Sequence, residues 1–293
     1  MFAFTQPLFA LLLVGGVGVL VFVTTRRRPD NTLPAAVASA RRHGLLIWVL
    51  AIATASTSAV LMVLQRVAPD LFDRAVMLAS SVAALTALAV LAFGELTWPR
   101  PAGAVRTARL TVRTPLASAP PLLTRLLVTV DGVGAAVITA GALLANNSGR
   151  AITYTTGHTS HGASPFPGLV YGLPAAIALG VVLVATYGVL ILVANRPAVV
   201  AADPQTDERL RRASAFRAVK VALCASLVLV GGLMFVGGVS GLNVEPPGAW
   251  PIVAWVGIVS GVVAVVGAVV TIMLPAPQIP PVSQPAPAAS LAA

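Results

Sequence analysis

The sequence predicts an all-α integral membrane protein, a bundle of seven transmembrane helices with the N-terminus outside the cell and the C-terminus in the cytoplasm. Three observations support this fold class. Apolar residues make up 57% of the 293 residues and charged residues only 10%, whereas a soluble domain carries about 25% charged residues. Seven segments reach the length of about 20 apolar residues that a helix needs to cross the hydrocarbon layer. The basic residues gather in alternate loops.

The seven predicted spans form one transmembrane domain over residues 1–274. The first is interpreted as an uncleaved anchor, because no charge precedes its apolar core and Arg26–Arg28 follow it. Asp207 and Glu208, followed by arginines, predict a helix start that continues into the sixth span without a break. Residues 275–293, rich in Pro and Ala, are expected to be a disordered cytoplasmic tail. The spans lie near residues 7–24, 44–65, 75–94, 126–146, 169–194, 219–241 and 250–274.

The orientation follows from the basic residues, because cytoplasmic loops retain an excess of Lys and Arg. The loops after the first, third and fifth spans hold 16 of the 19 basic residues. The loops on the opposite side hold only Arg66, Arg74 and Arg150. The net charge of +10 is therefore mainly a topology signal, and it does not indicate binding to nucleic acid.

The longest cytoplasmic loop, about 95–125, contains Arg106, Arg109 and Arg113. Their guanidinium groups are expected near the anionic lipid headgroups of the inner leaflet, each contributing about 1 kcal/mol. This charge is either ordinary positive-inside charge or a dedicated site for lipid or a partner subunit.

A candidate intramembrane polar site comprises one acid and several hydroxyls. Asp131 is the only acidic residue within the spans, and it lies about 7–8 Å inside the membrane if the edge is near Leu126. It is either a proton, cation or counter-ion site, or an acid paired with Arg125 or held by Thr129. The hydroxyls of the second and third spans either line a polar path or form packing hydrogen bonds. The site would combine Asp131 with Thr54, Thr57, Ser80 and Ser81.

Two histidines, His158 and His161, lie in the outer loop between the fourth and fifth spans. They could share a metal on one turn, but a complete site needs a third or fourth ligand, so no metal is predicted. The chain has a single cysteine, Cys224, which excludes a cysteine-rich metal site. Phosphate-binding and zinc-protease motifs are missing from the sequence, and no cofactor is predicted.

Three segments give the chain a resemblance to a protein group. They are Gly94–Pro101 (GELTWPRP), Gly162–Gly168 (GASPFPG) and Asp207–Arg212 (DERLRR). On these segments the chain resembles uncharacterised multi-pass membrane proteins of high-GC Gram-positive bacteria. The resemblance implies a bacterial cell membrane as the location, and it implies no activity.

The expected function is that of a non-enzymatic integral membrane protein, permease-like or an accessory component in transport or sensing. The alternative is a scaffold or signalling partner that acts through the basic cytoplasmic loops. A third hypothesis is a membrane enzyme that uses the outer histidine pair. The expected partners are the lipid bilayer and another membrane or cytoplasmic subunit.

Overall fold

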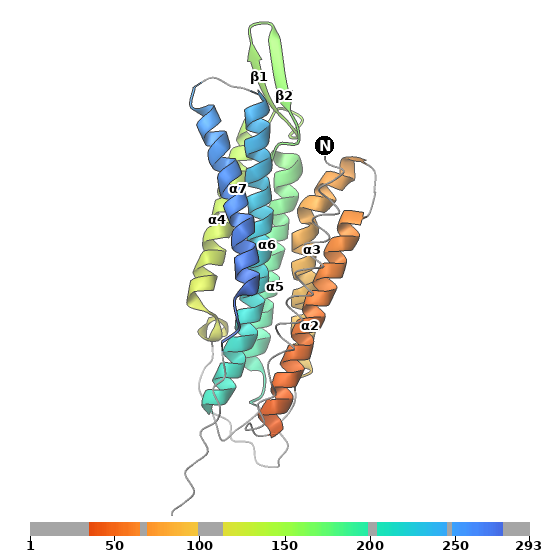
Figure 1. The fold of residues 1–293 in the computed structure, drawn as a ribbon, viewed down its shortest axis with the longest axis vertical. Coiled ribbons are helices and arrows are strands. Elements are labelled where there is room, and N and C mark those ends of the chain that lie inside the picture. Colours follow the sequence, from red (N-terminus) through yellow and green to blue (C-terminus); the bar gives the residue numbers. More distant parts are fainter. Residues whose placement is uncertain (1–34, 65–68, 99–113, 199–203, 245–247, 278–293) are drawn as a thin grey trace, which may run out of the picture.

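The computed structural model describes residues 35–64, 69–98, 114–198, 204–244 and 248–277, and within them six helices are long and apolar enough to cross a membrane. Figure 1 shows these helices side by side in one elongated bundle, with a β-hairpin at one end. A short 3-10 helix, Pro115–Ser118, precedes α4. The spanning helices are α2 (Ala35–Leu64), α3 (Pro69–Leu96), α4 (Pro121–Leu144), α5 (Leu169–Asn195), α6 (Pro204–Val244) and α7 (Trp250–Met273).

The membrane class is confirmed for these six segments, while the predicted span at 7–24 lies outside the described residues. The helices α2 and α6 begin well before the predicted starts at residues 44 and 219, because charged residues continue both helices beyond the apolar stretch. The predicted continuous helix from Asp207 into the sixth span is confirmed, since α6 is one helix of 41 residues. Most of the predicted tail, residues 278–293, also lies outside the described residues.

The all-α prediction is wrong in the loop between α4 and α5, where two antiparallel strands form a hairpin, β1 (Ile152–Thr156) and β2 (Thr159–Ala163). Alternating β-branched and aromatic residues in β1 favour a strand. Gly157 has φ +59, a value that glycine adopts without strain, and it allows the tight turn between Thr156 and Thr159. The Gly, Ser and Thr content of the loop masked this short pattern.

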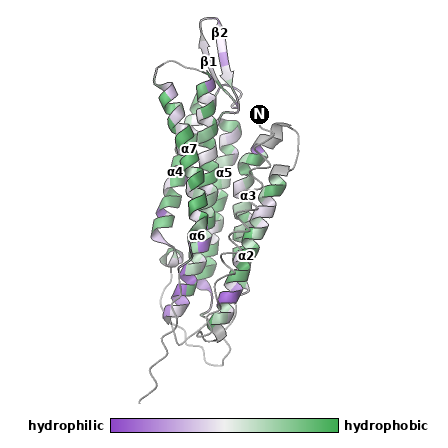
Figure 2. Ribbon diagram, in the orientation of Figure 1, coloured by the Kyte–Doolittle hydropathy of each residue, from purple (hydrophilic) through white to green (hydrophobic). Residues whose placement is uncertain are grey.

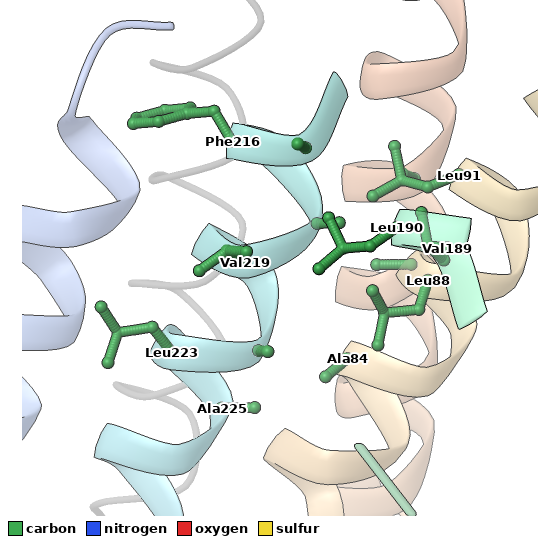
Figure 3. Packing of buried hydrophobic residues seen from close by; sticks show 14 of the residues in the cluster. Ala84, Leu88, Leu91, Val189, Leu190, Phe216, Val219, Leu223 and Ala225 are labelled. Carbon is green, nitrogen blue, oxygen red and sulfur yellow. The ribbon is translucent and has the colours of Figure 1, made fainter. Parts of the chain in front are cut away.

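The helix α6 is the centre of the bundle and packs against α7, α4, α3 and α5, while α2 packs mainly on α3. The main hydrophobic core joins α3, α5 and α6 and also includes buried residues of α2 and α4. In Figure 3, Leu88 and Leu91 of α3 lie near Leu190 of α5, whereas Val219 and Leu223 project from the other side of α6. The helices α4 and α7 both pack on α6, and each has another face that is exposed at the outside of the bundle.

Large apolar side chains cover the outside of the bundle, as expected where lipid replaces water. Val263 on α7 is 64% exposed and Leu143 on α4 is 81% exposed. A soluble protein rarely exposes apolar patches this extensive. Hydrophilic residues gather instead at the end of the bundle where α6 begins (Figure 2). We call this the basic end, and it also carries the start of α4 and the C-termini of α3, α5 and α7.

Candidate functional site

Asp131 lies ten residues after the start of α4 at Pro121, about 15 Å along a helix of 24 residues. The expected depth of about 7–8 Å was counted from a membrane edge at Leu126, five residues after the start of α4, and it stays a prediction. The neighbours of Asp131 on the same side of α4 are buried: Leu127 belongs to the main core, and Gly134 faces Val230 of α6 and Leu179 of α5. Asp131 thus lies on the packed side of the helix, near its middle.

Both carboxylate oxygens of Asp131 are buried and have no hydrogen-bond partner in the part of the chain that the structure describes. The hydroxyl of Ser226 on α6 interacts with the carboxyl. The two groups are not placed to form a hydrogen bond, and the Ser226 oxygen is likewise buried without a partner among the described residues. Among the described ion pairs and hydrogen bonds, none joins Asp131 to Arg125 or to Thr129.

This pair of groups is suited to holding a proton or a small cation. An ionised carboxylate that is buried without a partner costs several kcal/mol. A proton on the carboxyl, or a cation between the carboxylate and the Ser226 hydroxyl, would remove that cost. Two oxygen-bearing side chains are too few for a divalent metal, and the described residues contain no cluster of three His, Cys, Asp or Glu.

The predicted hydroxyl partners lie on α2 and α3, and none of the described hydrogen bonds joins them to Asp131. Thr54 and Thr57 donate hydrogen bonds to carbonyls of their own helix, α2. Ser81 is buried in α3, and the neighbouring Ser80 has a buried hydroxyl with no partner in the described part of the chain. The helices α2 and α3 pack on each other, whereas α4 packs on α5 and α6. The sequence did not single out Ser226, because its position opposite Asp131 depends on how α6 is rotated.

A second polar group of residues lies at the basic end, where α3, α5 and α6 meet. Arg196, directly after α5, forms a buried ion pair of 2.9 Å with Glu95 of α3. The same guanidinium nitrogen donates to the Ser214 hydroxyl of α6, 3.2 Å away. The Arg196 guanidinium also stacks on the ring of Trp98, with 3.8 Å between its central carbon and the ring centroid. Burial lowers the pKa of the Arg196 guanidinium, and the Glu95 charge opposes that shift.

Arg211 holds the end of α5 onto α6. Its side chain is completely buried and pairs with Asp207, one turn earlier, at 2.8 Å. Its two terminal nitrogens donate to the carbonyls of Val193, Ala194 and Arg196. These carbonyls lie at the C-terminus of α5, where helical partners are missing. Arg211 therefore acts as a side-chain cap for α5, supplied by α6.

The buried charge at the basic end was not recognised in the sequence, where Arg196 and Arg211 counted only as loop charges. Their burial arises because α6 begins well before its apolar stretch and packs along the end of α5. Three buried nitrogens there, Trp98 Nε1 and the Nε and Nη2 of Arg196, lack an acceptor among the described residues. A cavity of about 10 Å³ beside Trp98, lined also by His43 and Arg217, has room for about one water molecule.

The remaining predicted residues do not assemble into a site. His158 lies in the turn of the hairpin, and His161 lies on β2 opposite Tyr154. In the described part of the chain, no metal-binding cluster of three or more ligands includes them. Arg106, Arg109 and Arg113 lie outside the described residues.

Comparisons of the chain with protein-family models, with curated proteins and with solved structures found no match. A functional hypothesis therefore has to rest on the chemistry of the sites themselves.

Proposed function

We propose that the protein is a non-enzymatic component of a transport or sensing system in a bacterial plasma membrane, permease-like or accessory to a second subunit. Asp131 is its proton or cation site, and Ser226 is the second polar group at that site. The observation that carries this proposal is the Asp131 carboxyl, buried near the middle of a spanning helix without a partner in the described chain. Acids in such positions are rare and costly, and they mark ion or proton pathways.

The proposed topology has seven spans, including residues 7–24, with the N-terminus outside and the C-terminus in the cytoplasm. It is supported by the gathering of described charged residues at one end of the bundle (Figure 2) and by the positive-inside rule. The basic end would face the cytoplasm, and the β-hairpin would face the outside.

Labelling of single cysteines tests this topology in intact cells. With Cys224 replaced by alanine, Ser160→Cys in the exposed β2 strand is expected to react with a membrane-impermeant maleimide. Arg212→Cys, exposed at the basic end, is expected to react only after the cells are opened. The reverse pattern would overturn the orientation. An N-terminal tag that is inaccessible from outside would argue against the additional span at residues 7–24.

Ion flux through the full-length protein tests the role of Asp131. In vesicles loaded with a pH-sensitive dye, a potassium gradient with valinomycin provides the driving voltage. The wild-type protein is expected to carry protons, and Asp131→Asn is expected to slow this flux at least about ten-fold, because an amide cannot release a proton to the path. Glu208→Gln, an acid-to-amide change at a partly exposed residue, serves as the control.

An infrared measurement provides a readout that does not depend on turnover. A carboxyl C=O stretching band that changes with pH or with sodium in the wild type, and is missing in Asp131→Asn, would assign the bound proton to this residue. Equal flux in wild type and Asp131→Asn, together with no such band, would contradict the proposal.

A further inference from the structure

The small cavity at the basic end lies where α2, α3, α5 and α6 meet. Its lining includes His43 and Gly44 of α2, Trp98 just after α3, and Arg217 of α6. Its volume is about 10 Å³, which is room for about one water molecule. We propose that this cavity binds one chloride ion between the Arg217 guanidinium and the Trp98 indole N–H. This inference goes beyond the proposed function and does not depend on Asp131.

Two guanidinium groups at this cavity share one carboxylate. Glu95 lines the cavity and is paired with Arg196 at 2.9 Å. Arg217 interacts electrostatically with the same carboxylate, and it forms no ion pair of its own in the described part of the chain. The neighbouring pair of Arg211 and Asp207 is neutral as a whole. One positive charge is therefore not balanced among these groups, and a buried charge is costly until it is paired.

The Arg217 side chain is the main source of positive charge at the cavity. Its Nη1 donates to the Gly44 carbonyl at 2.8 Å, and its guanidinium carbon lies 6.0 Å from the centroid of the Trp48 ring. A guanidinium has five N–H donors, and this is the one hydrogen bond seen for Arg217 in the described chain. Lys220, three residues later on α6, interacts electrostatically with Arg217 and adds a further positive charge. The remaining donors of Arg217 and this charge favour an anion.

The indole N–H of Trp98 is a buried donor without an acceptor among the described residues. The Trp98 side chain lines the cavity, and the residue is only 6% exposed. Arg196 stacks on its ring, and the Nε and Nη2 of Arg196 are likewise buried without an acceptor in the described chain. An indole nitrogen donates and never accepts, so the group that satisfies it has to be an acceptor. An anion accepts hydrogen bonds from several donors at once.

The size of the cavity selects a halide among anions. A halide ion takes up about as much space as one water molecule, whereas a phosphate or a carboxylate consists of several heavy atoms and is too large. A water molecule would accept the Trp98 proton, but it would not balance the charge of Arg217. The Ser214 hydroxyl, which lines the cavity and accepts from Arg196 at 3.2 Å, keeps its own proton for an anion. Chloride is the halide that is abundant in cells.

Equilibrium dialysis of the full chain in detergent against radioactive chloride tests the proposal. Sodium gluconate keeps the ionic strength constant, because gluconate is too large for the cavity. The wild-type protein is expected to bind one chloride per chain in a saturable way, and bromide is expected to compete. Chloride at about ten times its Kd is also expected to raise the apparent melting temperature by about 3 °C, since it binds only the folded state.

Removing the donors tests the place of the ion. Arg217→Gln is expected to weaken chloride binding at least about ten-fold, because it removes the charge that the ion balances. Arg212→Gln is the matched control, since Arg212 is exposed at the same end and does not line the cavity. Trp98→Phe keeps the ring but removes its N–H, and it is expected to weaken binding about ten-fold. Trp255→Phe, at a residue 58% exposed on α7, is the control for it.

Glu95 provides a test in the opposite direction. It is the one acid among the residues that line the cavity, and its charge repels an anion there. Glu95→Gln is therefore expected to bind chloride at least about five-fold more tightly. If the buried pair of Glu95 and Arg196 only maintained the fold of this region, the same substitution would weaken chloride binding.

Each alternative outcome overturns the proposal in a different way. A wild-type protein without saturable chloride binding would mean that the cavity holds water only. Equal losses in Arg217→Gln and Arg212→Gln would mean that chloride is attracted by the charge of the whole basic end. Unchanged binding in Trp98→Phe would remove the cavity as the site, and this variant and Glu95→Gln carry the test if Arg217→Gln does not fold. Asp131→Asn is expected to bind chloride as the wild type does, so the result is independent of the proton or cation site.

Discussion

Arg211→Ala is expected to lower the free energy of unfolding by about 3–5 kcal/mol, because it removes one member of a buried ion pair, the one with Asp207. It also removes the donors to three carbonyls at the end of α5. Arg212→Ala changes the next residue of the same helix, and its ion pair with Glu208 has the same four-residue spacing. That pair is exposed, with 61% of the Arg212 side chain accessible, so we expect a loss of less than about 1 kcal/mol.

Labelling of the single cysteine, Cys224, measures the unfolding of the Arg211→Ala and Arg212→Ala variants. The Cys224 thiol, which lies against the Ala268 carbonyl at 3.5 Å, is expected to react with a fluorogenic maleimide only when the bundle opens. The apparent melting temperature in detergent and the unfolding midpoint in mixed SDS micelles should both fall for Arg211→Ala and barely change for Arg212→Ala. Similar shifts for the two variants would mean that Arg211 does not cap α5.

Gly238→Ala is expected to destabilise the contact between α6 and α7 by about 1–3 kcal/mol, the usual cost of overpacking. A Cβ atom at Gly238 would lie 2.5 Å from the carbonyl oxygen of Ala254 on α7. That oxygen belongs to the backbone, so relief requires the two helices to separate. The same contact continues at Gly261, where a Cβ atom would lie 2.6 Å from the Gly231 carbonyl oxygen.

Gly232→Ala is the matched control for this prediction. It adds the same methyl group to α6, at a position with no atom within 4 Å of the new carbon. Alanine favours a helix over glycine by about 1 kcal/mol, so this variant is expected to unfold at the same or a higher SDS fraction. If both variants shift the unfolding midpoint equally, the close approach of α6 and α7 at Gly238 is refuted.

Much of the fold could be predicted from the sequence because the bilayer imposes a length and a composition on each span. The six described spans, the long charged start of α6 and the unusual acid at Asp131 all follow from local residue patterns. The hairpin at Ile152–Ala163 was missed, because five-residue strands carry a weak signal in a loop rich in Gly, Ser and Thr.

The sequence alone determined that the chain is a helical membrane protein, because hydrophobic length and charge are properties of each segment by itself. Which arginines are buried and which serine lies beside Asp131 were decided only by the tertiary structure. These features depend on the rotation and spacing of helices that are far apart in the sequence. Arg211 and Arg212 are an example, because they are adjacent and chemically identical. Packing against α5 buries Arg211 and leaves Arg212 exposed.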